Sequence, residues 1–218
     1  MELGNIPNTA KVQRVIPKNA FDGYTTSKQR KLFTDLVARI TWTHKLAPET
    51  INLEAKEIKE LQVFRVELKV QVDIQTLLEV IDRAIPYHIV FIVVHKEAMY
   101  ISTSSKHPHP VNIDNAVVDY TFKTEWFNTK ENKFAFNLSR SIDAIYHDFC
   151  LQLSGTRALA QKSMDALVAY SKQVDYLNKE IEKLKSSITG SKQFNQKVEL
   201  NIRLKDLEKQ LKSVIVTT

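Results

Sequence analysis

The stretch ELQVFRVELKVQVD, residues 60–73, decides the fold because its side chains alternate between apolar and polar. Residues two apart on a strand point to the same face of a sheet, so this alternation predicts a strand with one buried face. The apolar positions of that face are Phe64, Val66, Leu68, Val70 and Val72. The positions expected to face solvent are Arg65, Glu67, Lys69 and Gln71.

Helices are predicted on both sides of this strand. The spacing of Thr26 and Gln29 is that of a capping box, and a one-sided apolar pattern after it predicts a helix over residues 27–39. Asp73 is placed to cap a second helix, which Pro86 closes. A further apolar stripe predicts a helix from about residue 139 onward.

The other β-rich segments complete a predicted mixed sheet. Residues 40–47, ITWTHKLA, are rich in β-branched and aromatic side chains, and residues 87–95, YHIVFIVVH, are nearly all apolar. Residues 99–105 follow closely enough to form a hairpin, and residues 116–127 alternate again. We therefore expect an α+β domain over residues 1–153, with helices flanking a mixed sheet.

The C-terminal part of the chain has the 3.5-residue apolar period of a coiled coil. The first run consists of Leu167, Tyr170, Val174, Leu177, Ile181, Leu184 and Ile188. The second run consists of Leu200, Leu204, Leu207, Leu211 and Val214. Because residues 189–191, TGS, interrupt the rhythm, we expect an antiparallel coiled-coil helical hairpin over residues 154–218 with a glycine turn.

This predicted hairpin also carries most of the charge excess. Residues 151–218 contain 12 basic and 7 acidic side chains, whereas the whole chain has a net charge of +6. Such an excess favours an acidic or polyanionic partner. Mixed signs along the helices favour docking of a protein over direct binding of DNA, and a homodimer through the hairpin stays open. The expected contact residues are Lys172, Lys179, Lys183, Lys185, Lys192, Lys197, Arg203, Lys205, Lys209 and Lys212.

Composition and motifs disfavour several classes of protein. The longest apolar run, Ile89 to Val94, is far below the roughly 18 residues of a membrane span, and the N-terminus lacks a signal-peptide pattern. A lone Cys150 fits a reducing compartment, so we expect a cytoplasmic protein. Phosphate-cradling glycine loops, serine-hydrolase motifs and metal-ligand clusters are missing from the sequence, which predicts no cofactor and no metal.

One catalytic alternative remains in the opening stretch. Glu67 and Lys69 form an acid-x-lysine pair, which metal-dependent nucleases place on a central strand next to a second carboxylate. Two carboxylates would hold Mg²⁺, and Glu54 is the available second one. Because glutamate and lysine are also ordinary on the wet face of a strand, a non-catalytic strand is the favoured interpretation.

Four segments together resemble a bacterial family known as a domain of unknown function. They are IPKNAFDGYTTSKQRKLF, ITWTHKL, ELQVFRVEL and IDRAIPYHIVFIV, and the resemblance spans most of residues 10–150. Members of that family are commonly encoded beside helicases and site-specific DNA methyltransferases, in operons resembling restriction or phage-defence systems. The resemblance implies an accessory subunit in a DNA-modifying or DNA-defending complex. Together with the missing catalytic motifs and the basic hairpin, it favours a non-enzymatic subunit that docks a helicase or methyltransferase. A direct DNA-binding module is a further alternative.

Overall fold

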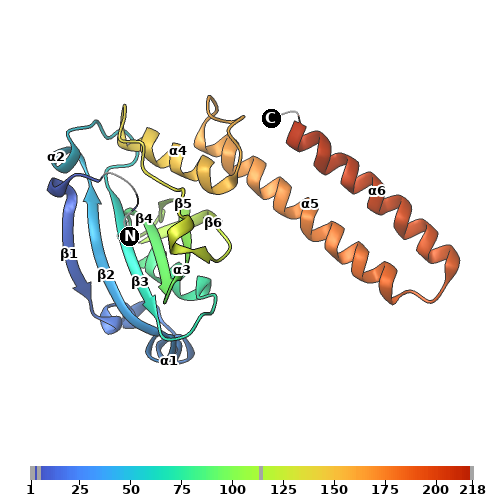
Figure 1. Cartoon of the computed structure of the whole chain (residues 1–218), viewed down its shortest axis with the longest axis horizontal. Helices are drawn as coiled ribbons and strands as arrows, with labels where there is room; N and C mark the ends of the chain where they lie inside the picture. Colours follow the sequence, from blue (N-terminus) through green and yellow to red (C-terminus); the bar gives the residue numbers. More distant parts are fainter. Residues whose placement is uncertain (1–2, 4–5, 113–114, 217–218) are drawn as a thin grey trace. The chain divides into compact units, whose positions relative to one another are not determined.

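The computed structural model describes Leu3, residues 6–112 and residues 115–216. Two compact units make up the chain, Met1–Thr156 and Arg157–Thr218. The first unit is built on a mixed sheet with helices around it, and the second contains two long helices that pack against each other (Figure 1). The predicted fold class, α+β with a C-terminal helical hairpin, is therefore confirmed.

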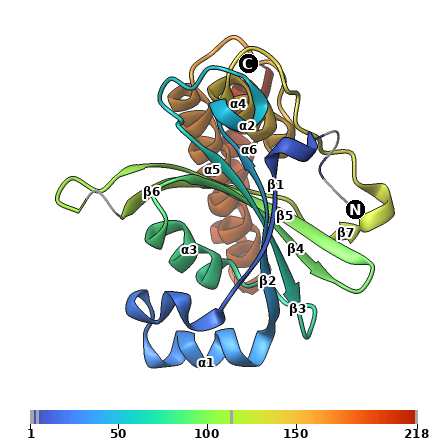
Figure 2. The ribbon, with the colours of Figure 1, turned by 90° about the vertical axis from the view of Figure 1, so that its left-hand side faces the viewer.

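The sheet has seven strands in the described part of the chain. They are β1 (Lys11–Ile16), β2 (Val37–Leu46), β3 (Leu61–Leu68), β4 (His88–His95), β5 (Ala98–Pro108), β6 (Ala116–Lys123) and β7 (Phe127–Asn128). Strands β1 to β6 lie in chain order, and β7 pairs with β5 (Figure 2). The pair β3 and β4 is parallel, as expected where a helix crosses over between two strands, and the other pairs are antiparallel.

Three of the described α-helices begin at a side chain that caps them, whereas the helix Gln75–Ala84 follows Ile74, whose side chain forms no cap hydrogen bond. The α-helices are α1 (Ser27–Leu36), α2 (Pro48–Ile51), α3 (Gln75–Ala84), α4 (Ile142–Ser154), α5 (Met164–Gly190) and α6 (Phe194–Val216). Short 3-10 helices cover Asn8–Ala10, Lys18–Tyr24 and Thr129–Glu131. Thr26 and Gln29 form the predicted capping box of α1, while Ser141 and Ser163 cap α4 and α5.

Helices α1 and α3 supply the core that covers one face of the sheet. Phe64 and Phe91, neighbours on β3 and β4, contact each other edge to face and are almost fully buried. Leu78 of α3 and Phe33 of α1 belong to the same apolar cluster. The predicted burial of Phe64, Val66 and Leu68 is thus confirmed.

The first helix and the alternating strand are among the elements whose boundaries differ from the sequence prediction. The first predicted helix was expected to reach residue 39, but α1 ends at Leu36 and Val37 begins β2 opposite Leu68. Strand pairing and the burial of Val37 outweigh the local helical pattern. The alternating stretch was expected to continue to residue 72, but β3 ends at Leu68, after which Lys69 N–H donates to Leu36 O at 2.8 Å.

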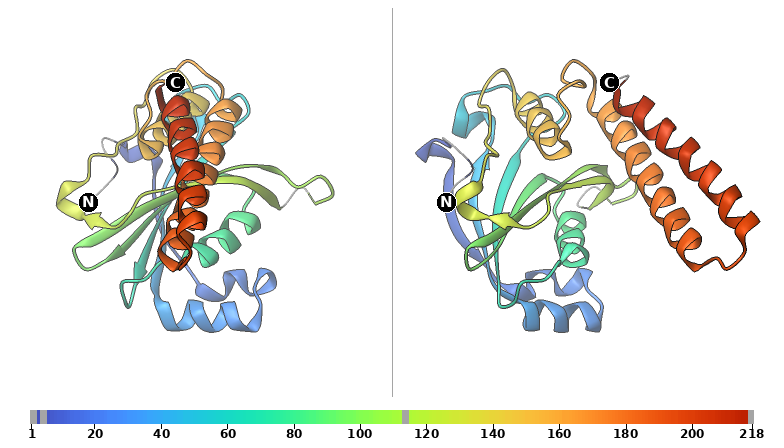
Figure 3. Two further views of the ribbon diagram at one scale, coloured as in Figure 1. Left: turned by 90° about the vertical axis from the view of Figure 1, so that its right-hand side faces the viewer. Right: turned by 45° about the vertical axis from the view of Figure 1, so that its right-hand side comes forward.

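The connection between the two long helices is also different. Gly190 is the last residue of α5, and the chain turns through residues 191–193 without a glycine in the left-handed region. Ser191 Oγ donates to Gln196 Oε1 at 2.8 Å, which ties the turn to the first turns of α6. Helices α5 and α6 run side by side in opposite directions, as the right-hand view of Figure 3 shows. The hairpin prediction is correct, but its turn needs no glycine.

Candidate functional site

The inner faces of the hairpin are buried unequally. On α5, Leu177 and Ile181 are only 3% and 5% exposed. On α6, the inward leucines of the predicted period, Leu200, Leu204, Leu207 and Leu211, are half-buried. Among the α6 side chains that the structure describes, none is fully buried. Helix α6 therefore keeps most of its surface in solvent.

Apolar side chains also lie on the outer face of α6, beside the lysines that the sequence predicted there. Phe194 is 78% exposed, Val198 43% and Ile202 57%. Their spacing of four residues places all three on one face of the helix. The signal was present in the sequence, because these positions fall outside the 3.5-residue seam and yet are apolar. Exposed apolar side chains gathered on one face are typical of an interaction surface.

The predicted contact residues of the hairpin are at the surface. All of them are exposed except Lys197, which is half-buried. On α5, Lys183 donates to Glu180 at 2.5 Å and Lys185 to Glu182 at 3.0 Å, and the Glu180 hydrogen bond raises the pKa of Lys183. These two lysines are partly neutralised by acids on their own helix. Their charge is less available to a partner than that of unpaired lysines.

Residues of the nuclease alternative are not brought together. The backbone of Glu54 forms an isolated β-bridge with Ser141, at the start of α4. Lys69, by contrast, donates from Nζ to Thr34 O of α1 at 2.7 Å. Helices α4 and α1 lie at opposite ends of β3 (Figure 1). Glu67 lies near the end of β3, and its Oε1 is 3.5 Å from Arg65 Nε. Among the described residues, no group of three or more His, Cys, Asp or Glu side chains is placed to hold a metal ion.

A shallow hollow lies beside this strand. Its volume is about 190 Å³. Its lining combines apolar and polar side chains: Leu3, Gln13, Thr43, His44, Val63, Arg65 and Ile92. Glu67 and Lys69 do not contribute to this lining, so the hollow does not join the acid-x-lysine pair to a substrate pocket.

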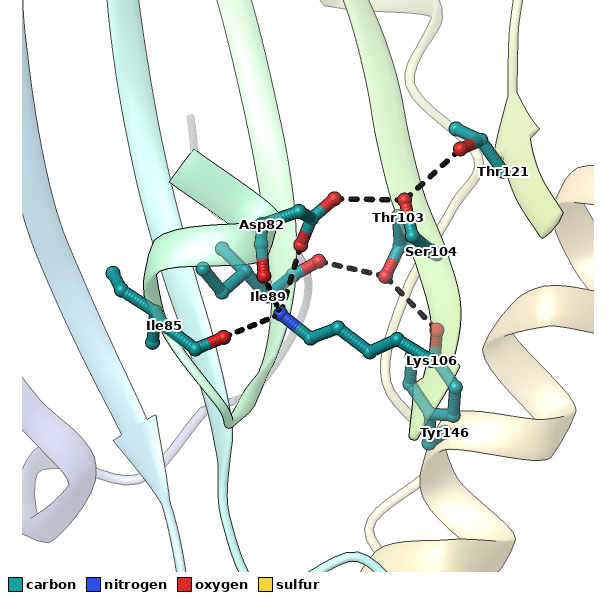
Figure 4. A network of polar contacts seen from close by, with 8 residues as sticks. All are labelled: Asp82, Ile85, Ile89, Thr103, Ser104, Lys106, Thr121 and Tyr146. Carbon is teal, nitrogen blue, oxygen red and sulfur yellow. Dashed lines mark hydrogen bonds and ion pairs between the residues drawn. The ribbon is translucent and has the colours of Figure 1, made fainter. Parts of the chain in front are cut away.

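A buried polar network that sequence analysis missed links α3 to β5. Lys106 Nζ donates to Asp82 Oδ1 at 3.0 Å and to the carbonyl oxygens of Asp82 and Ile85, each at 2.9 Å (Figure 4). Ser104 Oγ donates to Asp82 Oδ2 at 2.7 Å and contacts Thr121 Oγ1 at 3.0 Å. The available signal was Asp82 itself, four residues after Leu78 within an apolar helical stripe.

Burial shifts the pKa values of this region toward neutral forms. It raises the pKa of Asp82 and lowers that of Lys106, and in each case the opposite charge of the other residue partly offsets the effect. Burial lowers the pKa of His88 to about 3 and raises the pKa of the Cys150 thiol. The cysteine is fully buried beside Tyr146, so it packs as an apolar side chain and presents no thiolate.

The carboxylate of Asp143, in the first turn of α4, binds three backbone N–H groups of the loop before β3. Asp143 accepts hydrogen bonds from the N–H groups of Lys56, Glu57 and Ile58 at 2.9, 3.0 and 3.0 Å. Burial raises the pKa of Asp143, but these hydrogen bonds outweigh it, and the net shift is downward. The carboxylate therefore fixes the loop before β3 and is not free to act as a general base.

Comparison with known proteins assigns the chain to a family. A family model described as "Domain of unknown function (DUF4391)" matches residues 5–211. The chain belongs to this family. The DUF4391 match extends past the sheet unit through α5 and most of α6, so the hairpin is part of the family domain. Neither a curated protein nor a solved structure matches the chain.

No helix in the described part of this DUF4391 chain is long and apolar enough to cross a membrane.

Proposed function

We propose that this DUF4391 chain is a non-enzymatic interaction subunit of a DNA restriction-modification or phage-defence-like complex in the cytoplasm. Its sheet unit serves as the rigid base, and the C-terminal hairpin docks a helicase or a DNA methyltransferase. The observation that carries the proposal is the surface of α6, where Phe194, Val198 and Ile202 face solvent. An exposed apolar row costs solubility unless it is covered, and a partner protein would cover it.

The sheet unit supports the proposal through its chemistry. Among its side chains of shifted pKa, Asp82 and Lys106 are buried and hydrogen-bonded to each other, and the half-buried His88 packs against Tyr146. Glu54 and Glu67 are separated, with Glu67 beside Arg65. The identity of the partner class comes from the resemblance, because relatives are commonly encoded beside helicases and methyltransferases.

Co-expression tests the proposal directly. The full chain, produced with any helicase or DNA methyltransferase encoded beside its gene, should elute with one of them from a size-exclusion column. Elution of the chain alone in every combination would contradict docking. If Mg²⁺-dependent DNA cleavage by the chain disappeared in Glu67→Gln, the nuclease alternative would replace the proposal. Binding of duplex DNA that weakens steeply with salt would favour the DNA-binding alternative.

A further inference from the structure

The outer face of α6 changes from apolar to basic along its length. Phe194, Val198 and Ile202 are followed on the same face by Lys205, Lys209 and Lys212, and all six are exposed. We name these six residues the α6 stripe. At 3.6 residues per turn, they fall within a sector of about 80°, with an apolar part about 12 Å long and a basic part about 10 Å long.

The lysines of the α6 stripe differ from those of α5 in their surroundings. Lys183 and Lys185 of α5 pair with glutamates three residues earlier. Lys205, Lys209 and Lys212 form no ion pair with any residue that the structure describes. Asp206 and Glu208 flank the lysines of the α6 stripe without forming an ion pair with them. On the face of the stripe itself the three ammonium groups repel one another, so an acidic surface placed against them is favoured.

We propose that the α6 stripe binds a protein whose surface has an apolar groove leading into an acidic patch. This inference rests on the proposed function and specifies the partner surface for the hairpin. The order is fixed by the helix: the groove receives Phe194, Val198 and Ile202, and the acidic patch faces the lysines. Apolar contact supplies most of the affinity, while the charges select the partner and set its direction along α6.

The lengthwise order of the stripe disfavours other occupants. A second copy in antiparallel orientation would place lysines on the apolar part, and in parallel orientation it would place lysines on lysines. A nucleic-acid backbone binds through its charged phosphates and would leave Phe194, Val198 and Ile202 uncovered. A helix lying on a membrane surface carries its apolar row along its whole length with lysines at the flanks, whereas here the row gives way to Lys205 and Lys209.

Paired variants of the full chain test the stripe against whichever helicase or methyltransferase co-purifies with it. The apolar variant is Val198→Ser with Ile202→Ser, and the charge variant is Lys205→Glu with Lys209→Glu. Matched controls are Tyr176→Ser on α5, which alters a side chain 61% exposed, and Lys28→Glu with Lys31→Glu on α1, which alters exposed lysines outside the predicted contact residues. Because every changed side chain is at the surface, each variant should keep its helices. Circular dichroism checks this.

The apolar variant should weaken binding about 10- to 100-fold, because two apolar contacts leave the interface. The charge variant should weaken binding about tenfold in 0.1 M salt and much less in 0.5 M salt, as screening predicts. Both controls should bind within about twofold of the unchanged chain.

If both α6 variants form the complex as well as the unchanged chain, binding through the α6 stripe is contradicted. The proposed docking function is not affected by that result. If the unchanged chain forms no complex with either protein, the docking function and the stripe fail together. Binding of the unchanged chain to phosphatidylglycerol vesicles, or its self-association, would also overturn the stripe if that property disappeared in Val198→Ser with Ile202→Ser.

Discussion

Asp82 of α3 and Lys106 of β5 form an ion pair in the interior of the sheet unit, with Lys106 Nζ 3.0 Å from Asp82 Oδ1 and side chains only 1% and 0% exposed. The ammonium group has three oxygen acceptors, and Asp82 also accepts from Ser104, so the polar atoms of the pair are well satisfied. This arrangement fastens the crossover helix α3 to β5, the second strand of the β4–β5 hairpin. Removing one partner leaves a buried charge without its counter-charge.

Asp82→Ala should therefore lower the free energy of unfolding by about 3–5 kcal/mol, measured by urea denaturation. The double variant Asp82→Leu with Lys106→Met should lose much less than the summed losses of its two single variants, because neither charge remains buried alone. Additive losses in this cycle would show that the two groups do not depend on each other.

His88 gives the sheet unit a dependence on acid. Its ring packs edge to face on Tyr146 at 4.6 Å, and burial, aided by the positive charge of Lys106, lowers its pKa to about 3. Because the unfolded chain binds the proton near pH 6.5 and the folded chain does not, stability is complete above that pH and falls below it. Between pH 6.5 and 5 the free energy of unfolding should decrease by about 1–1.5 kcal/mol from this group.

The matched variant for this test is His88→Phe, which keeps a ring beside Tyr146 and removes the titrating group. Its urea-unfolding free energy should change less over the same pH range. Equal slopes for the two proteins would assign the acid sensitivity to other residues.

Asp143 should be a strong anchor of the loop before β3. Asp143→Ala removes the acceptor of three backbone N–H groups, and we expect a loss of about 1–3 kcal/mol in the free energy of unfolding. Asp143→Asn retains an oxygen acceptor but no charge, so its loss should be smaller. Chemical denaturation of both variants measures the difference, and two equal losses would contradict the role of the charge.

Two glycines should respond in opposite ways to alanine. Gly190 lies in α5, and an added Cβ would meet nothing within 4 Å, so Gly190→Ala should raise the stability of the hairpin by about 0.5 kcal/mol. Gly155 has a φ of 69° at the end of α4, where alanine is strained, and Gly155→Ala should cost about 1 kcal/mol. Thermal unfolding of the two variants gives the signs. A loss of stability in Gly190→Ala would instead support the prediction that the turn requires this glycine.

Sequence periodicity predicted the elements whose side chains repeat over many residues. Strand β3 and the two hairpin helices were found in this way, whereas β4 was predicted from its nearly unbroken apolar run. Strand β1, residues 11–16, was missed because an edge strand with mostly exposed side chains has no apolar period. Its place in the sheet comes from pairing with β2, which is a long-range contact.

The candidate site was predictable only in part. The lysines of the hairpin could be named from charge alone, and they lie at the surface. The exposed row that begins at Phe194 was missed because heptad counting follows the seam and ignores the outer face. The contact of Asp82 with Lys106 joins residues 24 positions apart on different elements, so no local pattern indicates it.

Hydrogen–deuterium exchange of the full chain, with and without the co-purifying helicase or methyltransferase, tests the docking of α6 most directly. We predict that the partner slows exchange of backbone amides along residues 194–212 and leaves β3 and β4 unchanged. Slowed exchange confined to the sheet unit, with residues 194–212 exchanging as fast as in the free chain, would contradict a docking role for α6.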